Sequence, residues 1–414
     1  MISKQTIQSI ARVLILLAFM PPATCNDWPR FRGLNGDGVS HETGLIDSWP
    51  ETGPSLIWEH GLGEGYSELI IVDSRVYTMA QLGEDAETFL LAFQALDGKE
   101  IWRAPMGEGY ESDWGNGPRA TPFHDDGVLY TLGPKGQFAA VSAQDGSLIW
   151  SVQLVDDLKA ELPGFGFSGS PVVEGDNVYL EIGAGDEGLF AAFHKKTGKQ
   201  LWRALKGSAG YMTPRPATIG EVRQLIFMGP KALNALDMEG NLLWSHAWNN
   251  LGETIATPVF IPPDNIFLSS VKSGQSLLIR IKNQDGNFST QDMWKNTNLK
   301  NHFSASIHHQ AYLYGFDNAS FKCVSIKDGS TVWQKRGYGK GSITLVDNKF
   351  LLLSDRGLLA MVSASPDGFE EKARYQAMSG RCWTSPSISN GRLYLRNHEK
   401  MACYNLKNAT EIKP

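Results

Sequence analysis

The chain has 414 residues, of which 42% are hydrophobic and 20% charged, and its formal net charge is −6 at pH 7. This length exceeds one ordinary domain but fits a single large repeat assembly, and 43 Gly with 12 Trp suit many short strands and a recurring aromatic packing position. The acidic balance argues against general nucleic-acid binding, so we expect no nucleic acid among the partners.

The first 25 residues have the pattern of an export signal. Lys4 and Arg12 form a positive start, and an apolar run over residues 13–20 leads to a small-residue exit. Because eight apolar residues are too few to cross a bilayer, we expect cleavage near Cys25 and no transmembrane segment afterwards. The sequence therefore predicts a periplasmic or secreted protein. Lipid anchoring through Cys25 is an alternative that residues 22–24 disfavour, because they match the acylation motif poorly.

Residues 26–54 are rich in Gly and turn formers, with Trp28 and Phe31 as aromatic anchors. We expect an irregular segment that packs over one face of the body, and a short C-terminal tail at residues 407–414. Cys323, Cys382 and Cys403 are an odd set that does not suggest a disulfide framework.

One short motif recurs between residues 55 and 406: a polar residue, Gly, two free positions, an aliphatic residue and Trp. Each copy follows a short apolar run, which predicts a hairpin of two strands around a tight Gly turn. The anchors are 39 to 52 residues apart, a period that fits four strands per unit. We expect the indoles to dock neighbouring units, each with its N–H on a carbonyl. These anchors are Trp58, Trp102, Trp150, Trp202, Trp244, Trp294 and Trp333, with a degenerate copy at Tyr375.

The two ends of the array complete each other. Trp58 ends a strand that has no hairpin partner before it, while the last unit, after Trp383, has no Trp strand of its own. Seven full intervals and one split unit predict an all-β, eight-bladed β-propeller of four-stranded antiparallel blades over residues 55–406. This WD-like repeat architecture is closed by the N-terminal strand, which removes free sheet edges.

Three local matches to catalytic or metal motifs lack the required context. Residues 183–188 match G-x-G-x-x-G, but a strand follows instead of a helix. Residues 166–170 resemble a nucleophile elbow without strand–turn–helix surroundings. His308 and His309 would point to opposite faces of a strand, so they do not suit one metal ion. We expect no catalytic residue and no metal site from these motifs.

Cationic or aromatic residues stand at or near the entry to the first strand of several units, and a propeller would gather them around one axis. Such a set could bind an anionic, partly planar ligand at the channel mouth. The alternative is a mixed, solvated rim in which Glu64, Asp113 and Glu253 form internal salt bridges. The predicted ligand-binding residues are Tyr66, Arg119, Arg215, His302, Lys340, Arg381 and Trp383.

The Gly-x-x-aliphatic-Trp turns resemble the tryptophan-docking repeats of pyrroloquinoline quinone (PQQ)-type β-propellers. That family includes quinoprotein dehydrogenases and an outer-membrane assembly lipoprotein. Residues 28–33, 300–303 and 380–384 are also similar to segments of exported proteins from planctomycete-like bacteria. The resemblance covers residues 55–406, and it is specific for fold rather than function.

The dehydrogenases in this family hold PQQ and calcium in the channel, with a catalytic Asp and, in many, two adjacent cysteines. This sequence has no adjacent cysteines, no Asp in a recognisable family motif and no C-x-x-C-H haem site. We therefore predict a monomeric, non-catalytic scaffold that binds a small anionic ligand or an envelope protein. The alternatives are a PQQ- and calcium-dependent dehydrogenase of alcohols or sugars, and an outer-membrane assembly scaffold.

Overall fold

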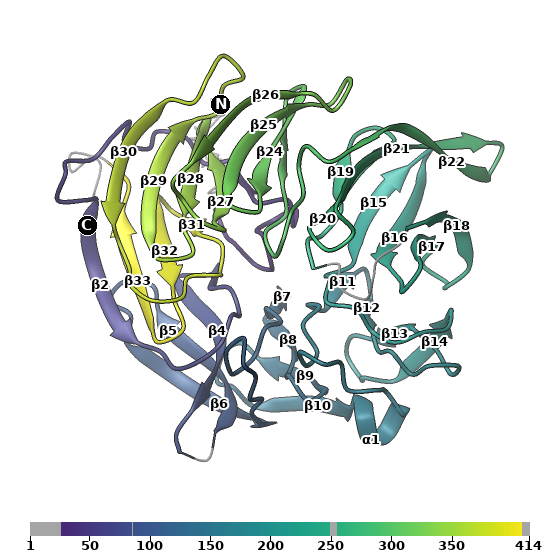
Figure 1. The fold of residues 1–414 in the computed structure, drawn as a ribbon. Coiled ribbons are helices and arrows are strands. Elements are labelled where there is room, and N and C mark those ends of the chain that lie inside the picture. Colours follow the sequence, from purple (N-terminus) through teal and green to yellow (C-terminus); the bar gives the residue numbers. More distant parts are fainter. Residues whose placement is uncertain (1–25, 85, 249–254, 408–414) are drawn as a thin grey trace, which may run out of the picture.

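The computed structural model describes residues 26–84, 86–248 and 255–407, which form a ring of eight blades (Figure 1). Every blade is a four-stranded antiparallel sheet, so the predicted eight-bladed propeller is confirmed. The expected export signal, Cys25 and residues 408–414 lie outside the described residues. No helix in the described part is long and apolar enough to cross a membrane.

Strands follow one another from the centre of the ring outwards in blades 1 to 4. Blade 1 has β3 (Ile70–Val72), β4 (Arg75–Leu82), β5 (Glu87–Gln94) and β6 (Glu100–Glu108). Blade 2 has β7 (Phe123–Asp125), β8 (Val128–Leu132), β9 (Gln137–Ser142) and β10 (Leu148–Gln153), followed by α1 (Leu154–Leu158). Blade 3 has β11 (Val172–Glu174), β12 (Asn177–Glu181), β13 (Phe190–His194) and β14 (Gln200–Ala204). Blade 4 has β15 (Arg215–Ile219), β16 (Val222–Met228), β17 (Ala232–Leu236) and β18 (Leu242–Ala247).

The same order continues in blades 5 to 8. Blade 5 has β19 (Val259–Ile261), β20 (Asn265–Ser270), β21 (Gln275–Gln284) and β22 (Asn287–Asn296). Blade 6 has β23 (Ile307–His309), β24 (Tyr312–Asp317), β25 (Ser320–Ser325) and β26 (Thr331–Arg336). Blade 7 has β27 (Ser342–Val346), β28 (Lys349–Leu353), β29 (Leu358–Ser363) and β30 (Glu371–Gln376), to which β1 (Val39–Ser40) adds. Blade 8 has β31 (Ser387–Ser389), β32 (Arg392–Arg396), β33 (Lys400–Asn405) and β2 (Ser55–Gly61).

The recurring Trp residues lie between blades. Five indole N–H groups donate to a backbone carbonyl of the next blade, as expected for blade docking. Trp244 differs because it donates to Gln224 Oε1 of its own blade at 2.8 Å, and Trp102 Nε1 is buried with no hydrogen-bond partner among the described residues. The five pairs are Trp58–Ala95 (3.1 Å), Trp150–Lys195 (2.8 Å), Trp202–Met238 (3.2 Å), Trp294–Ile326 (2.7 Å) and Trp333–Ser365 (3.0 Å).

The turn glycine of each hairpin explains why Gly and Trp recur together. Gly198 has φ +68°, and a Cβ there would lie 2.7 Å from the ring of Trp150 in the preceding blade. Gly146 lies against Trp102 in the same manner, with a Cβ at 2.7 Å. Gly therefore serves both the positive φ of the turn and the close approach of the neighbouring indole. One hairpin thus contributes its Gly to the blade before it and its Trp to the blade after it.

Blade 8 is completed by strand β2 from the N-terminal part of the chain. β2 pairs antiparallel with β33, and Trp58 lies opposite Cys403. Arg396, which is 1% exposed, fastens the same blade to blade 1. Its guanidinium donates to the carbonyls of Gly65 (2.9 Å), Ser67 (2.9 Å) and Met79 (3.0 Å). The split blade is therefore closed by strand pairing on one side and by a buried arginine on the other.

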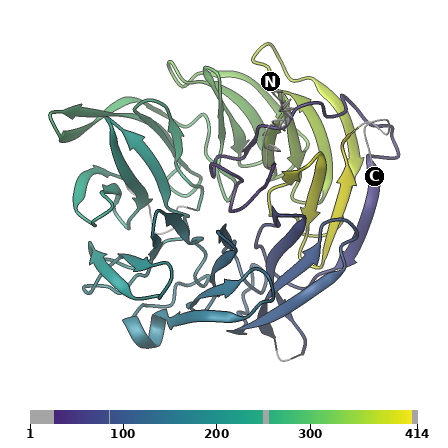
Figure 2. The ribbon, with the colours of Figure 1, turned by 180° about the vertical axis from the view of Figure 1, so that it is seen from behind.

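The irregular segment before β2 begins near the middle of the ring, where Figure 2 shows it in purple, and we call residues 28–40 the central segment. Farther on, residues 42–48 contact the turn between β27 and β28, the turn between β31 and β32, and Lys372 of blade 7. Trp28 forms an antiparallel bridge with Ile71 of blade 1, and the His124 N–H of blade 2 donates to Pro29 O at 2.9 Å. On the opposite side, β1 pairs in parallel with the innermost strand of blade 7.

Arg32 anchors this central segment. It is 3% exposed, and its guanidinium donates to Ala305 O at 3.1 Å and Ser306 O at 3.2 Å in blade 6. Its backbone N–H donates to the buried carboxylate of Glu68 at 2.8 Å. Burial raises the pKa of Glu68 to about 7, although the Arg32 N–H and the Arg32 charge both lower it. The inner strands supply the acceptors that this arginine requires, which explains its path into the centre.

Candidate interaction surface at the channel mouth

Four of the seven residues predicted from the sequence meet at one place. Tyr66 stacks on Trp383 with ring centroids 5.6 Å apart. The Arg381 guanidinium lies 4.8 Å above the Trp383 ring, and that of Arg119 lies 5.5 Å above Tyr66. They come from the connections that lead into blades 1, 2 and 8, so the fold gathers them as expected. We define the mouth cluster as Tyr66, Trp114, Arg119, Phe303, Arg381 and Trp383.

The two arginines of the mouth cluster hold the connection between blades 1 and 2. Arg381 Nη1 donates to Tyr66 Oη at 3.0 Å and to Trp114 O at 2.5 Å. Arg119 donates to the carbonyls of Gly115 and Gly117, both at 2.9 Å. Buried polar groups need such partners, and here the guanidiniums find them within the chain. Several of their N–H donors are therefore used to fix the loop.

Trp114 is the exposed member of the mouth cluster, with 54% of its surface accessible. Its carbonyl accepts from both Arg381 and Tyr66 Oη, the latter at 2.6 Å, and its ring lies 6.5 Å from that of Trp383. Gly115 follows at φ +107°, where a Cβ would lie 1.9 Å from Tyr66 Oη. The loop is thus locked beneath an indole that faces solvent. Sequence reasoning missed Trp114, because it lies in the connection between β6 and β7, ahead of the residues that open blade 2.

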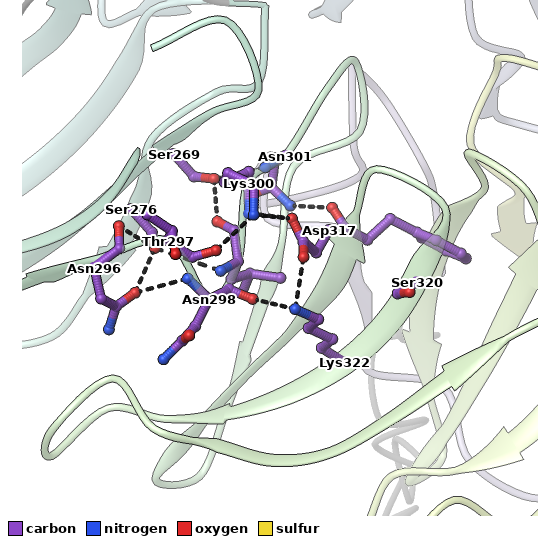
Figure 3. A network of polar contacts seen from close by, with 12 residues as sticks. Ser269, Ser276, Asn296, Thr297, Asn298, Lys300, Asn301, Asp317, Ser320 and Lys322 are labelled. Atoms are coloured by element: carbon purple, nitrogen blue, oxygen red, sulfur yellow. Dashed lines mark hydrogen bonds and ion pairs between the residues drawn. The ribbon is translucent and has the colours of Figure 1, made fainter. Parts of the chain in front are cut away.

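Phe303 joins the mouth cluster from blade 6 and stacks on Trp383 with centroids 5.2 Å apart. A polar network fixes the chain just before it (Figure 3). Asn301 N–H donates to Ser269 Oγ at 2.6 Å, and Asn301 Nδ2 donates to Phe316 O at 3.0 Å. Asn301 therefore ties the entry of blade 6 to both blades 5 and 6.

Asp317 is the charged centre of that network (Figure 3). It forms ion pairs with Lys322 at 2.6 Å and Lys300 at 2.9 Å. Burial acts to raise the pKa of Asp317, but hydrogen bonds from Lys322 and Lys300 outweigh it, so the pKa is lowered. The pattern Lys300–Phe303, singled out in the sequence, thus has a structural role, because it positions Phe303.

The remaining three predicted residues do not join the mouth cluster. His302 and Lys340 line a shallow hollow beside Phe303. Arg215 begins the innermost strand of blade 4 and donates to Gly36 O of the central segment. The structure therefore divides the predicted site into three places.

Carboxylates at the rim have internal partners, in part as the alternative interpretation expected. Glu64 accepts from Asn116 Nδ2 at 2.9 Å and lies 3.7 Å from His398 Nδ1. Burial lowers the pKa of His398, while a hydrogen bond to Asn116 O and the Glu64 charge raise it. Asp113 is exposed at the rim, and Glu253 lies outside the described residues. The rim therefore has features of both alternatives. It contains internal polar pairs such as Glu64 with Asn116, and it contains the aromatic rings of the mouth cluster.

Comparison with known families decides the relationship. The family model described as outer membrane protein assembly factor BamB, a PQQ-repeat family, matches residues 86–335, more than half of the chain. The chain belongs to this family. The predicted resemblance to PQQ-repeat propellers is therefore confirmed.

Proteins similar to this PQQ-repeat chain have low sequence identity to it. The uncharacterized protein RP232 of Rickettsia prowazekii is 24% identical over 226 residues, which are 53% of this chain and 49% of that protein. BamB from Moraxella catarrhalis has a TM-score of 0.57 and 14% identity, over 84% of this chain and 98% of that one. Quinohemoprotein alcohol dehydrogenase from Comamonas testosteroni has a TM-score of 0.64 and 11% identity, over 94% and 82%. This likeness shows the fold alone.

The charged residues at the centre of this PQQ-repeat ring indicate which kind of ion could bind there. Calcium takes six to eight oxygen ligands, usually including carboxylates. Here the central segment brings Arg30 and Arg32 next to Arg215, and the buried Glu68 carboxylate is bonded to the Arg32 N–H. Within the described residues, no three His, Cys, Asp or Glu side chains gather as metal ligands. Within the described residues, the centre thus offers positive charge, which favours an anion, rather than a set of carboxylate ligands for calcium.

A buried carboxyl beneath the entry to blade 4 gives a pH-dependent prediction. Glu181 is 6% exposed and accepts from the Gly210 N–H at 2.8 Å, and burial raises its pKa to about 8. The folded state keeps this proton between pH 4.5 and 8 while the unfolded state releases it, so stability should fall as the pH rises through that window. We expect Glu181→Gln to gain stability of order 1–3 kcal/mol at about pH 8 and none near pH 4.

Urea denaturation of both proteins at several pH values measures this gain. The exposed Glu239→Gln variant is the control and should follow the wild type throughout. An equal difference between wild type and Glu181→Gln at about pH 4 and about pH 8 would contradict the assignment.

Proposed function

We propose that this chain is a non-catalytic binding scaffold of the cell envelope, and that the mouth cluster is the surface on which a protein partner docks. One observation carries the proposal: the 54%-exposed Trp114 is held on a rigid platform of aromatic and arginine side chains. Trp, Tyr and Arg are the residues that most often dominate the binding energy of protein interfaces. A fixed indole loses little freedom on binding, which favours affinity.

The arrangement of the charges favours a protein over a small ligand at this place. Arg119 and Arg381 use some of their donors on backbone carbonyls and Tyr66, so fewer donors remain for a small anion at the mouth cluster. An aromatic surface with a polar rim is typical of a docking patch. Two observations favour a partner in the cell envelope. One is the export signal expected at residues 1–25, and the other is the description of the family as an outer-membrane assembly factor.

The test is site-specific crosslinking in the native host. A photo-reactive amino acid at position 114 should give a discrete adduct with an envelope protein. The same residue at position 148 is the matched control, because Leu148 is 63% exposed on the outer strand β10. The purified partner should then bind Trp114→Ala at least ten-fold more weakly than it binds Leu148→Ala.

Two results would overturn the proposal. One is an adduct pattern at position 114 that matches the one at position 148. The other is reduction of a dye with an alcohol or sugar substrate that depends on added PQQ and calcium, because this activity would make the chain a dehydrogenase.

A further inference from the structure

A separate cleft lies between the central segment and the inner ends of blades 2 to 5. The central segment contributes Arg30 and Phe31 to its wall, and the blades contribute Phe123, Arg215 and Thr257. The cleft is distinct from the mouth cluster, since none of the six residues of the mouth cluster lines it. Its walls combine two guanidiniums with two aromatic rings.

Arg215, which lines this cleft, has a hydrogen-bond donor that is not satisfied by the described residues. One of its Nη atoms donates to Gly36 O, but its Nε is buried without a hydrogen-bond partner among the described residues. A buried N–H without an acceptor is costly and rare in folded proteins. An acceptor bound in the cleft would satisfy it.

Arg30 adds a second charge at the same wall. Its guanidinium lies 5.1 Å from the centre of the Phe123 ring and donates to Leu34 O at 2.7 and 3.0 Å. These contacts orient the guanidinium without neutralising it. Burial, followed by repulsion from Arg215, lowers the pKa of Arg30 to about 10, so the group remains charged at neutral pH.

The surrounding charges leave an excess of positive charge. Arg223 is paired with Glu174 at 2.5 Å, and Arg32 is attracted to Glu68. Arg30 is attracted to Glu174 and then to Asp37, and Arg215 is attracted to Asp37. The four arginines 30, 32, 215 and 223 therefore outnumber the three carboxylates 37, 68 and 174 in a desolvated place, where an added anion would be stabilised.

We propose that this cleft binds a small oxyanion, a carboxylate or phosphate group, between Arg215 and Arg30. Arg215 Nε and the Arg30 guanidinium contact the oxyanion, and Phe31 and Phe123 contact the apolar part of a ligand that has one. The site is independent of the docking surface, so either proposal can fail alone.

Calorimetric titration of the full-length protein tests this site with inorganic phosphate and with benzoate, at constant ionic strength set with chloride. We expect saturable binding of at least one probe. Arg30→Gln should weaken that binding at least ten-fold. Arg215→Lys keeps the charge but removes Nε, and it should weaken binding by a similar factor. Lys99→Gln, at an exposed cation outside the cleft, is the control and should bind as the wild type does.

The relative affinity of the two probes separates a phosphate ligand from a carboxylate ligand. Absence of saturable binding for both probes would overturn the proposal, and so would equal binding by wild type and Arg30→Gln. If Arg215→Lys does not fold, the Arg30→Gln comparison decides alone.

Discussion

Replacing Arg396 with Ala should destabilise the folded ring by about 3–5 kcal/mol. The side chain is 1% exposed and links blade 8 to several acceptors of blade 1. Its removal takes the arginine donor from the buried Gly65 carbonyl, leaves Ser67 O with Thr78 Oγ1 as its side-chain donor, and opens a cavity between the two blades. A buried acceptor without a partner costs more than the bond it lost, because water cannot replace the arginine.

Guanidinium chloride denaturation gives the magnitude. Arg356→Ala is the control, because its side chain is exposed, and it should change stability by less than about 0.5 kcal/mol. Arg396→Lys should fall between wild type and Ala, since an ammonium keeps the charge but cannot reach the same set of carbonyls. A loss below about 1 kcal/mol for Arg396→Ala would contradict the role of this residue in closure.

Replacing Arg32 with Met should cost a similar amount, about 3–5 kcal/mol, because it leaves the buried Glu68 without its neighbouring positive charge. It also removes the donors to Ala305 and Ser306, which fasten the central segment to blade 6. The loss should be larger at about pH 8 than at about pH 5, since burial raises the pKa of Glu68 to about 7 even with Arg32 present.

A double-mutant cycle separates the electrostatic part of this effect. Glu68→Gln in the Arg32→Met background should recover about 1–3 kcal/mol, because the amide carries no charge to be left uncompensated. Unfolding is measured for the four proteins in urea at both pH values. Strictly additive losses at the higher pH would show that the two side chains do not interact.

Local repetition explains why the fold could be predicted from the sequence. The Gly and Trp of each hairpin lie close together in the chain and obey one rule of packing, in which Gly198 meets the Trp150 of the blade before it. Each copy repeats the same local signal, so the blade count followed from spacing. The unpaired Trp58 strand supplied the closure, and its pairing with β33 is confirmed.

The site could be predicted only in part, because it depends on residues that break the repeat. Tyr66, Arg381 and Trp383 were found by their position before an inner strand. Trp114 lies in an irregular connection between two blades, so no periodic signal marks it. The place of Arg215 depends on the path of the central segment.

That path is fixed by contacts distant in the sequence. The N–H of Arg32 reaches Glu68, 36 positions away, and its guanidinium reaches Ser306, 274 positions away. No local propensity encodes partners at such separations, and Gly-rich composition alone is equally compatible with a surface loop.

The pairing of β2 with β33 also constrains the order in which the strands can assemble during folding. Trp58 leaves the ribosome early, yet its partner Cys403 is made 345 residues later. During synthesis, β2 and the central segment before it lack their final neighbours, because the ring into which they fit does not yet exist. Such late, non-local pairing is slow and leaves strand edges open to other chains. The last event in forming this molecule is therefore the return of its earliest strand, and a factor that shields β2 until then would raise the yield of folded protein more than one that acts on any middle blade.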